Sequence, residues 1–135
     1  MASTAPLHVT LPGGRRVDVR LGAHLIHTDQ PVSNGGEDSA PSPFDLFLAS
    51  IGACAGIFVQ GFCAARNLPT GGVVIEEQPH FDEAGVLRAV DLLVRLPPDF
   101  PERYRDAVVK VVEQCSVKRA IAAQPDFSVR VAPAA

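Results

Sequence analysis

The chain has 135 residues, of which 47% are hydrophobic and 20% charged, and its formal net charge at pH 7 is −3. This composition is typical of a globular protein and excludes the disordered and collagen-like classes. The small negative charge, without a run of Lys or Arg, argues against nucleic-acid binding. We expect a single domain over residues 1–135.

The cysteine count and the N-terminal residues bear on the compartment. Three cysteines, an odd number, do not suit a disulfide framework, and the opening MASTAPLHVTLPGG lacks the basic and apolar regions of a signal peptide. The uncharged run over residues 46–59 is shorter than the roughly 20 residues that span a membrane. The sequence therefore predicts a soluble, cytoplasmic protein with reduced thiols and no membrane association.

Three short strands are predicted in the N-terminal third. Apolar residues alternate over 7–11 and 17–21, around a turn at 12–14, and a third strand is expected over 24–28. Residues 30–43 then form a loop rich in glycine and proline, whose 14 residues exceed the usual connection of about 4–6. Long loops of this kind are often functional.

A long helix is predicted next, over residues 44–66. Ser42 is a suitable cap, Pro43 suits the first turn, and Asp45 favours the positive end of the helix dipole. Apolar residues lie nearly all round this helix, which predicts that it is buried.

The remaining residues predict two strands, two helices and a closing strand. The strands span 73–81 and 86–96, the helices 101–114 and 116–123, and the last strand 127–131. The order β-β-β-α-β-β-α-α-β favours an α+β domain in which antiparallel sheet covers a central helix.

Two cysteines, Cys54 and Cys63, lie in the predicted long helix. Nine positions at about 100° each put them on opposite sides, so they cannot line one site. Cys63 is best interpreted as a packed core thiol. Cys54 is too far from the start of its own helix for the dipole to lower its pKa, so we expect a nearby cation to do so. The candidates are Arg15, Arg16, Arg20, Arg66 and Arg88.

The third cysteine, Cys115, ends the apolar stripe of the helix predicted over 101–114. From there it can face Cys54 across the core, and two thiols on packed helices are typical of a peroxidatic and resolving pair. Judged by position alone, filling the core is the commoner role for both.

Other kinds of site are not indicated by the sequence. His24, His27 and His80 lack the spacing of zinc ligands and no CxxC occurs, so no metal or cofactor is expected. The glycine pairs fit neither GxxxxGK nor GxGxxG, and no GxSxG is present.

The segment GGEDSAPSPFDLFLASIGACAGI, followed later by VVEQCSVKRAI, resembles the OsmC/Ohr family of osmotically inducible and organic hydroperoxide resistance proteins. The first segment is similar to the family's proline-led long helix, with a cysteine eleven positions after Pro43. The second is similar to its later cysteine at a helix end. This resemblance covers nearly the whole chain, and it implies an intertwined homodimer of α+β subunits with two active sites at the dimer interface.

The resemblance also implies a chemistry. In the characterised peroxidases of the family, the helix cysteine attacks a hydroperoxide and becomes a sulfenic acid, and the later cysteine resolves it as a disulfide. A dithiol reductant, often lipoyl-linked, restores both thiols. On this sequence those roles would fall to Cys54 and Cys115.

The chain departs from the peroxidase pattern in ways that resemble a divergent OsmC-like subgroup. The peroxidase branches carry a Glu directly after the helix-starting proline, paired with an N-terminal Arg that activates the thiol. Here that position is Phe44, and the acid comes one step later, at Asp45, about 100° round the helix. Arg16 or Arg20 would be the activating arginine. Ser116 stands where many relatives have a proline.

Three hypotheses follow. The leading one is a cytosolic thiol peroxidase with an antioxidant role in oxidative stress, in which Cys54 attacks small organic hydroperoxides and Cys115 resolves. The second is a non-catalytic dimer of this fold that binds an apolar small molecule at its interface, with Phe44 and Phe47 as pocket lining. The third is a general thiol redox protein without peroxide specificity.

Overall fold

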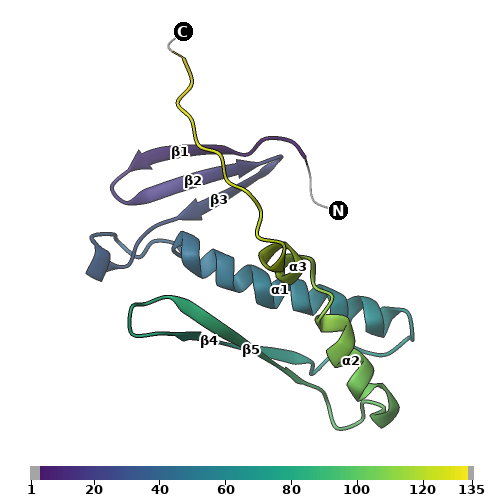
Figure 1. Cartoon of the computed structure of the whole chain (residues 1–135). Coiled ribbons are helices and arrows are strands. Elements are labelled where there is room, and N and C mark those ends of the chain that lie inside the picture. Colours follow the sequence, from purple (N-terminus) through teal and green to yellow (C-terminus); the bar gives the residue numbers. More distant parts are fainter. Residues whose placement is uncertain (1–3, 134–135) are drawn as a thin grey trace. The chain divides into compact units, whose positions relative to one another are not determined.

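The computed structural model describes residues 4–133, and the chain divides into two compact units, Met1–Ala49 and Ser50–Ala135. In the N-terminal unit, β1 (His8–Gly13), β2 (Arg16–Leu21) and β3 (His24–Thr28) form an antiparallel sheet in that order (Figure 1). Val19 at the centre of β2 pairs with Val9 on one side and Ile26 on the other. The three predicted N-terminal strands are therefore confirmed.

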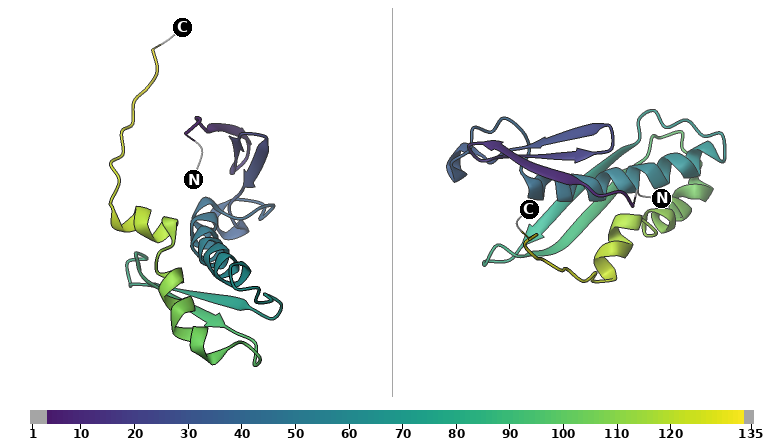
Figure 2. Two further views of the ribbon diagram at one scale, coloured as in Figure 1. Left: turned by 90° about the vertical axis from the view of Figure 1, so that its right-hand side faces the viewer. Right: turned by 90° about the horizontal axis from the view of Figure 1, so that it is seen from above.

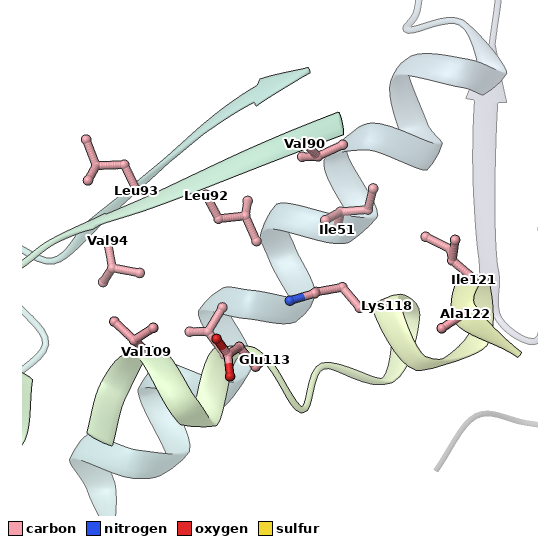
Figure 3. A pocket seen from close by; sticks show the side chains of 11 residues that line it. Ile51, Val90, Leu92, Leu93, Val94, Val109, Glu113, Lys118, Ile121 and Ala122 are labelled. Atoms are coloured by element: carbon pink, nitrogen blue, oxygen red, sulfur yellow. The ribbon is translucent and has the colours of Figure 1, made fainter. Parts of the chain in front are cut away.

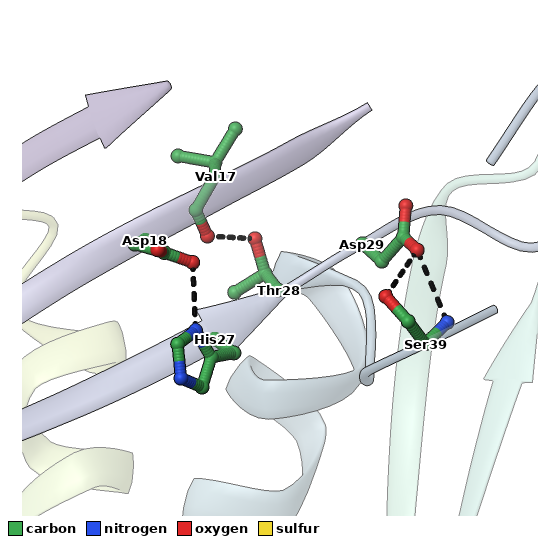
Figure 4. A network of polar contacts seen from close by, with 6 residues as sticks. All are labelled: Val17, Asp18, His27, Thr28, Asp29 and Ser39. Carbon is green, nitrogen blue, oxygen red and sulfur yellow. Dashed lines mark hydrogen bonds and ion pairs between the residues drawn. The ribbon is translucent and has the colours of Figure 1, made fainter. Parts of the chain in front are cut away.

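A buried carboxylate organises the long loop that follows the sheet. Asp29 is only 1% exposed, and its oxygens accept hydrogen bonds from the backbone N–H groups of Gln30 (2.7 Å), Ser39 (3.0 Å) and Glu37 (3.3 Å). The Ser39 hydroxyl donates a fourth, at 2.6 Å (Figure 4). These bonds, led by the two from Ser39, lower the pKa of Asp29 to about 2. The carboxylate thus ties the two ends of the loop together.

Glycine is required at one position in this loop. A Cβ added to Gly36 would overlap the carbonyl oxygen of Gln30 and crowd the Asp29 carboxylate. Because the obstacle includes backbone, the clash cannot be relieved by a side-chain rotation. Nearby, the Thr28 hydroxyl donates to the Val17 carbonyl at 2.6 Å and anchors the end of β3 to β2 (Figure 4).

The long helix α1 spans Pro43–Ala64, close to the predicted range. Its start has reciprocal hydrogen bonds between Ser42 and Asp45. The Asp45 N–H donates to the Ser42 hydroxyl oxygen at 3.2 Å, and the Ser42 N–H donates to the Asp45 carboxylate at 3.3 Å. This is the capping-box arrangement, with Asp in place of Glu or Gln.

In the C-terminal unit, β4 (Val74–Phe81) and β5 (Leu87–Arg95) form an antiparallel hairpin. From Ser50 onward α1 lies across one face of this hairpin (Figures 1 and 2). The predicted alternation along β5 is confirmed, since Leu92, Val94 and Leu96 all pack against the core. That core consists of Ala55, Val59, Phe62, Cys63, Phe100, Val108 and Val112.

The helix predicted over 101–114 is broken into shorter pieces. A 3-10 turn at Glu102–Tyr104 precedes α2 (Arg105–Val112), and α3 (Ser116–Ala122) follows. Cys115 therefore lies beyond the end of α2 and occupies the N-cap position of α3. The prediction that Cys115 faces the core is nonetheless confirmed, because its side chain, like that of Val108, is fully buried.

Glycine in α1 allows the hairpin to approach closely. A Cβ at Gly52 would lie 2.6 Å from a carboxylate oxygen of Glu77 on β4. The glycine in the middle of this helix thus costs some intrinsic helix stability but makes room for the Glu77 carboxylate against the helix.

α1 is a core helix as predicted, but its burial is not all round, and the predicted closing strand is absent from residues 4–133. Only Ile51, Ala55, Val59, Phe62 and Cys63 of α1 are buried, whereas Phe44 is 47% and Ile57 65% exposed. The closing strand predicted over 127–131 does not form: residues 124–133 pair with no other strand, and the left view of Figure 2 shows this C-terminal stretch as an extended trace. A strand needs a second edge for its N–H and C=O groups, and no strand within residues 4–133 pairs with this segment.

The length and composition of α1 alone would also allow it to cross a membrane. Its buried residues, however, form the centre of a core built with β4, β5 and α2. A central helix of a globular domain satisfies the same test, so α1 is interpreted as a core helix.

Candidate active site: a pair of thiols

The structure brings together two of the three cysteines, and all three are free thiols. Cys54 is half-buried on α1, and Cys115 is fully buried at the start of α3. The two thiols interact directly by hydrogen bonding. Cys63, also fully buried, belongs to the core on the other side of α1, as helical geometry predicts.

The surroundings of Cys54 favour its thiolate. Burial alone would raise the pKa of Cys54, but hydrogen bonding with the Cys115 thiol and with the N–H groups of Val117 and Ser116 outweighs it. The pKa of Cys54 therefore lies below the usual value of 9.0. Ser116 and Val117 are the first two residues of α3, whose N–H groups have no partner within that helix.

The surroundings of Cys115 act in the opposite direction. Burial raises its pKa above 9.0, and so does its interaction with Cys54. Of the two thiols, Cys54 is therefore the better acid and the one that loses its proton first.

The lowering of the Cys54 pKa differs in origin from the sequence-based expectation. The helix dipole was excluded because Cys54 lies in the middle of α1, and a cation was expected instead. The structure shows neutral donors, two backbone N–H groups and a thiol. The N–H groups that contact Cys54 belong to the start of α3, and not to α1, the helix that carries Cys54. The sequence contains a signal for this arrangement: a helix is predicted to begin at Ser116, directly after Cys115, so its first N–H groups lie next to the second thiol.

The five candidate arginines fall into two groups. Arg66 stacks on the Phe62 ring, 3.6 Å from its centroid, and Arg88 forms an ion pair with Asp82 at 2.7 Å, so both have other partners. Arg15 lies in the turn between β1 and β2, and Arg16 and Arg20 lie on β2, all in the N-terminal unit. Activation of Cys54 by Arg16 or Arg20 stays a prediction.

Phe44 and Asp45, where the chain departs from the peroxidase pattern, both lie in the first turn of α1. Phe44 occupies the second position of α1 and packs against Phe47, with ring centroids 5.4 Å apart. Asp45 is engaged with Ser42 in the helix cap. Within residues 4–133, no group of three or more His, Cys, Asp or Glu side chains could hold a metal ion.

Comparison with solved structures gives the same fold. A stress-response protein from Psychrobacter arcticus, described as a putative osmotic stress induced and detoxification response protein, is 19% identical, covers 89% of this chain and 90% of its own, and has a TM-score of 0.75. An OsmC-like protein from Mycoplasma pneumoniae is 12% identical, with 92% and 91% covered and a TM-score of 0.71.

A third solved structure carries a functional description. It is an organic hydroperoxide resistance protein OsmC, also described as a predicted redox protein, from Legionella pneumophila. It is 21% identical, covers 88% of this chain and 90% of its own, and has a TM-score of 0.58. No curated protein matches the chain.

The family model for OsmC-like proteins matches residues 36–130, which contain the long helix, both thiols of the pair and most of the unpaired C-terminal segment. Proteins of this family are typically dimers. The chain belongs to the OsmC-like protein family.

Proposed function

We propose that this protein is a thiol peroxidase that reduces organic hydroperoxides, with Cys54 as the nucleophile and Cys115 as the resolving thiol. The observation that carries the proposal is the contact of the two thiols: Cys54 hydrogen-bonds with the fully buried Cys115 and with the N–H groups of Ser116 and Val117, an arrangement that lowers the pKa of Cys54 and raises that of Cys115. A thiolate is the attacking form of cysteine, and a neighbouring protonated thiol supplies both a proton and a second sulfur.

The chemistry proceeds in three balanced steps. The Cys54 thiolate attacks the terminal peroxide oxygen, so that an S–O bond forms, the O–O bond breaks, and Cys54 becomes a sulfenic acid. The leaving alkoxide takes the Cys115 proton and departs as an alcohol. The Cys115 thiolate then attacks the Cys54 sulfur, forming the disulfide and releasing hydroxide, which is protonated to water. A dithiol, for which a lipoyl group is a candidate, reduces the disulfide by thiol–disulfide exchange.

The working form that we propose is a cytoplasmic homodimer. Apolar residues of α1 that are exposed in the single chain, including Phe44 and Ile57, support a dimer in which a second copy of the chain buries them. The C-terminal segment supports it as well, because Phe127, Val129 and Val131 are at least 90% exposed at alternate positions. The free thiols suit a reducing compartment.

The test is to mix the reduced protein with one equivalent of cumene hydroperoxide and to weigh the intact chain over time. We expect a loss of two hydrogen atoms within seconds, and peptide mapping should locate the disulfide between Cys54 and Cys115. Unchanged thiols after many minutes would overturn the proposal and favour the binding-protein hypothesis.

Three variants complete this experiment. Cys115→Ser should stop at a Cys54 sulfenic acid, which dimedone traps, whereas Cys63→Ser should form the disulfide at the parental rate. Cys54→Ser should not react. The same protein treated with a small-molecule disulfide in place of the peroxide tests the third hypothesis, since a general thiol redox protein would react with it faster than with the peroxide.

A further inference from the structure

A pocket lies close to the thiol pair but is lined by other residues. It has a volume of about 510 Å³, is partly open to solvent, and is lined by β5, α2 and α3, together with Ile51 of α1 (Figure 3). This volume falls within the range of small-molecule sites, roughly 300–1,000 Å³. Ile51 precedes Cys54 by three residues, and Val112 and Lys118 each lie three residues from Cys115.

The walls of the pocket are almost entirely apolar. Val90 and Leu92 line it from β5, Val109 from α2 and Ile121 from α3. Such walls remove the hydrocarbon part of a ligand from water, and that removal contributes about 25 cal/mol for each Å² of apolar surface buried.

Two charged residues, Lys118 and Glu113, interrupt the apolar lining. Figure 3 shows the Lys118 side chain extending from α3 into the pocket. Lys118 is half-buried, whereas Glu113 is exposed. Among the described residues, no carboxylate lies within ion-pair distance of the Lys118 ammonium, Glu113 included.

The different burial of Lys118 and Glu113 decides which sign of charge the pocket favours in a ligand. A half-buried ammonium beside apolar walls has lost part of its hydration and gains from a counterion in a medium of low polarity. An exposed carboxylate is screened by water and salt and repels an anion only weakly. The pocket therefore favours an anion over a cation.

We propose that this pocket binds an amphipathic monocarboxylate, a saturated short- or medium-chain fatty acid, with its carboxylate paired to Lys118 and its alkyl chain against Val90, Leu92 and Ile121. The site goes beyond the proposed peroxidase, because the ligand has no peroxide group and binding needs no thiol. Glu113 lies at the rim and weakens the affinity.

The test uses isothermal titration calorimetry on the full-length, reduced Cys54→Ser protein with three probes of equal chain length: octanoate, octan-1-ol and octylammonium. We expect octanoate to bind with one site per chain, octanol more weakly, and octylammonium most weakly. Equal affinities for the three probes would show apolar partitioning alone and overturn the proposal. Absence of saturable octanoate binding, as when a second copy or the C-terminal segment fills the pocket, would also overturn it.

Variants of the two charged residues sharpen the result. Lys118→Met keeps the length of the side chain but removes its charge, and should weaken octanoate binding at least about tenfold while leaving octanol binding unchanged. Lys118→Arg should retain octanoate binding. Glu113→Gln, the matched control, should strengthen octanoate binding by roughly twofold. Octanoate affinity that is unaffected by Lys118→Met would overturn the proposal. Because all binding is measured without the Cys54 thiol, failure here leaves the peroxidase proposal untouched.

Discussion

Asp29 in the N-terminal unit and Cys54 in the C-terminal unit are two acidic groups whose pKa values are lowered by hydrogen-bond donors. In each case a side-chain donor contributes most to the lowering, and backbone N–H groups add to it. Asp29 accepts four hydrogen bonds and is 1% exposed. Cys54 is half-buried and shares its position with a second thiol. A buried anion whose hydrogen bonds are fully satisfied fixes a loop, whereas a partly accessible thiol beside a second thiol retains its capacity to react.

Substitution of each group should have the largest effects. Cys54→Ser should lower the rate of hydroperoxide consumption by about 10³-fold or more, because a hydroxyl is a far weaker nucleophile at neutral pH. Asp29→Asn should leave that rate within about twofold but lower the midpoint of urea unfolding, because the amide cannot accept all four hydrogen bonds. A peroxidase rate that falls as far in Asp29→Asn as in Cys54→Ser would show that the loop takes part in the chemistry.

The loop around Asp29 should also depend on its glycine. Gly36→Ala should destabilise the protein by about 1–3 kcal/mol, since the new methyl group meets the Gln30 carbonyl. Gly71→Ala is the matched control, because nothing lies within 4 Å of a Cβ at that position. Urea unfolding followed by circular dichroism measures both. Equal stability of the two variants would show that the loop rearranges freely.

The pH dependence of stability should reveal the Asp29 carboxylate. Its pKa falls from 3.8 to about 2 on folding, so its contribution is complete above pH 3.8 and is lost as the pH falls towards 2. The difference in stability between the parent and Asp29→Asn should therefore shrink over this interval. Urea unfolding at a series of pH values measures it, and a difference that stays constant with pH would assign the effect to packing instead.

The contribution of Cys115 to the Cys54 pKa can be separated from its proposed role as the resolving thiol. Cys115→Ala removes a donor, so the pKa of Cys54 should rise and its alkylation by iodoacetamide at neutral pH should slow by roughly three- to tenfold. Cys115→Ser keeps a donor and should preserve the parental rate. The readout is the pH profile of Cys54 alkylation, followed by mass spectrometry of its peptide. Parental rates in both variants would mean that the backbone N–H groups suffice.

The smallest effect is expected from Ser116→Pro. This substitution removes one N–H group near the Cys54 sulfur, at the first position of α3, where proline is well tolerated. We expect Cys54 alkylation to slow by about twofold, with unchanged stability. A larger change would show that Ser116 contributes more than Cys115 or Val117 to holding the thiolate.

Local patterns predicted most of the fold. The alternation along β5, the cap formed by Ser42 and Asp45, and the opposite positions of Cys54 and Cys63 each depend on a few neighbouring residues, and each is found in the structure. These features follow from the periods of helix and strand and from the chemistry of helix ends.

Features that depend on distant partners were not predictable. The N–H groups near Cys54 come from a helix more than sixty residues further along the chain. The Asp29 network depends on how residues 30–39 turn back, and no periodic pattern encodes that turn. The FSVRV segment has the pattern of a strand, but pairing requires an edge that the chain does not supply to it.

The unpaired segment with Phe127, Val129 and Val131 has a consequence for how stability should be described. If these side chains become buried only when two copies meet, mass action makes folding free energy and association free energy inseparable. The melting temperature should then rise with protein concentration, and strong dilution should release subunits prone to aggregate through the exposed segment. For this chain, a stability value would have meaning only together with the concentration at which it was measured.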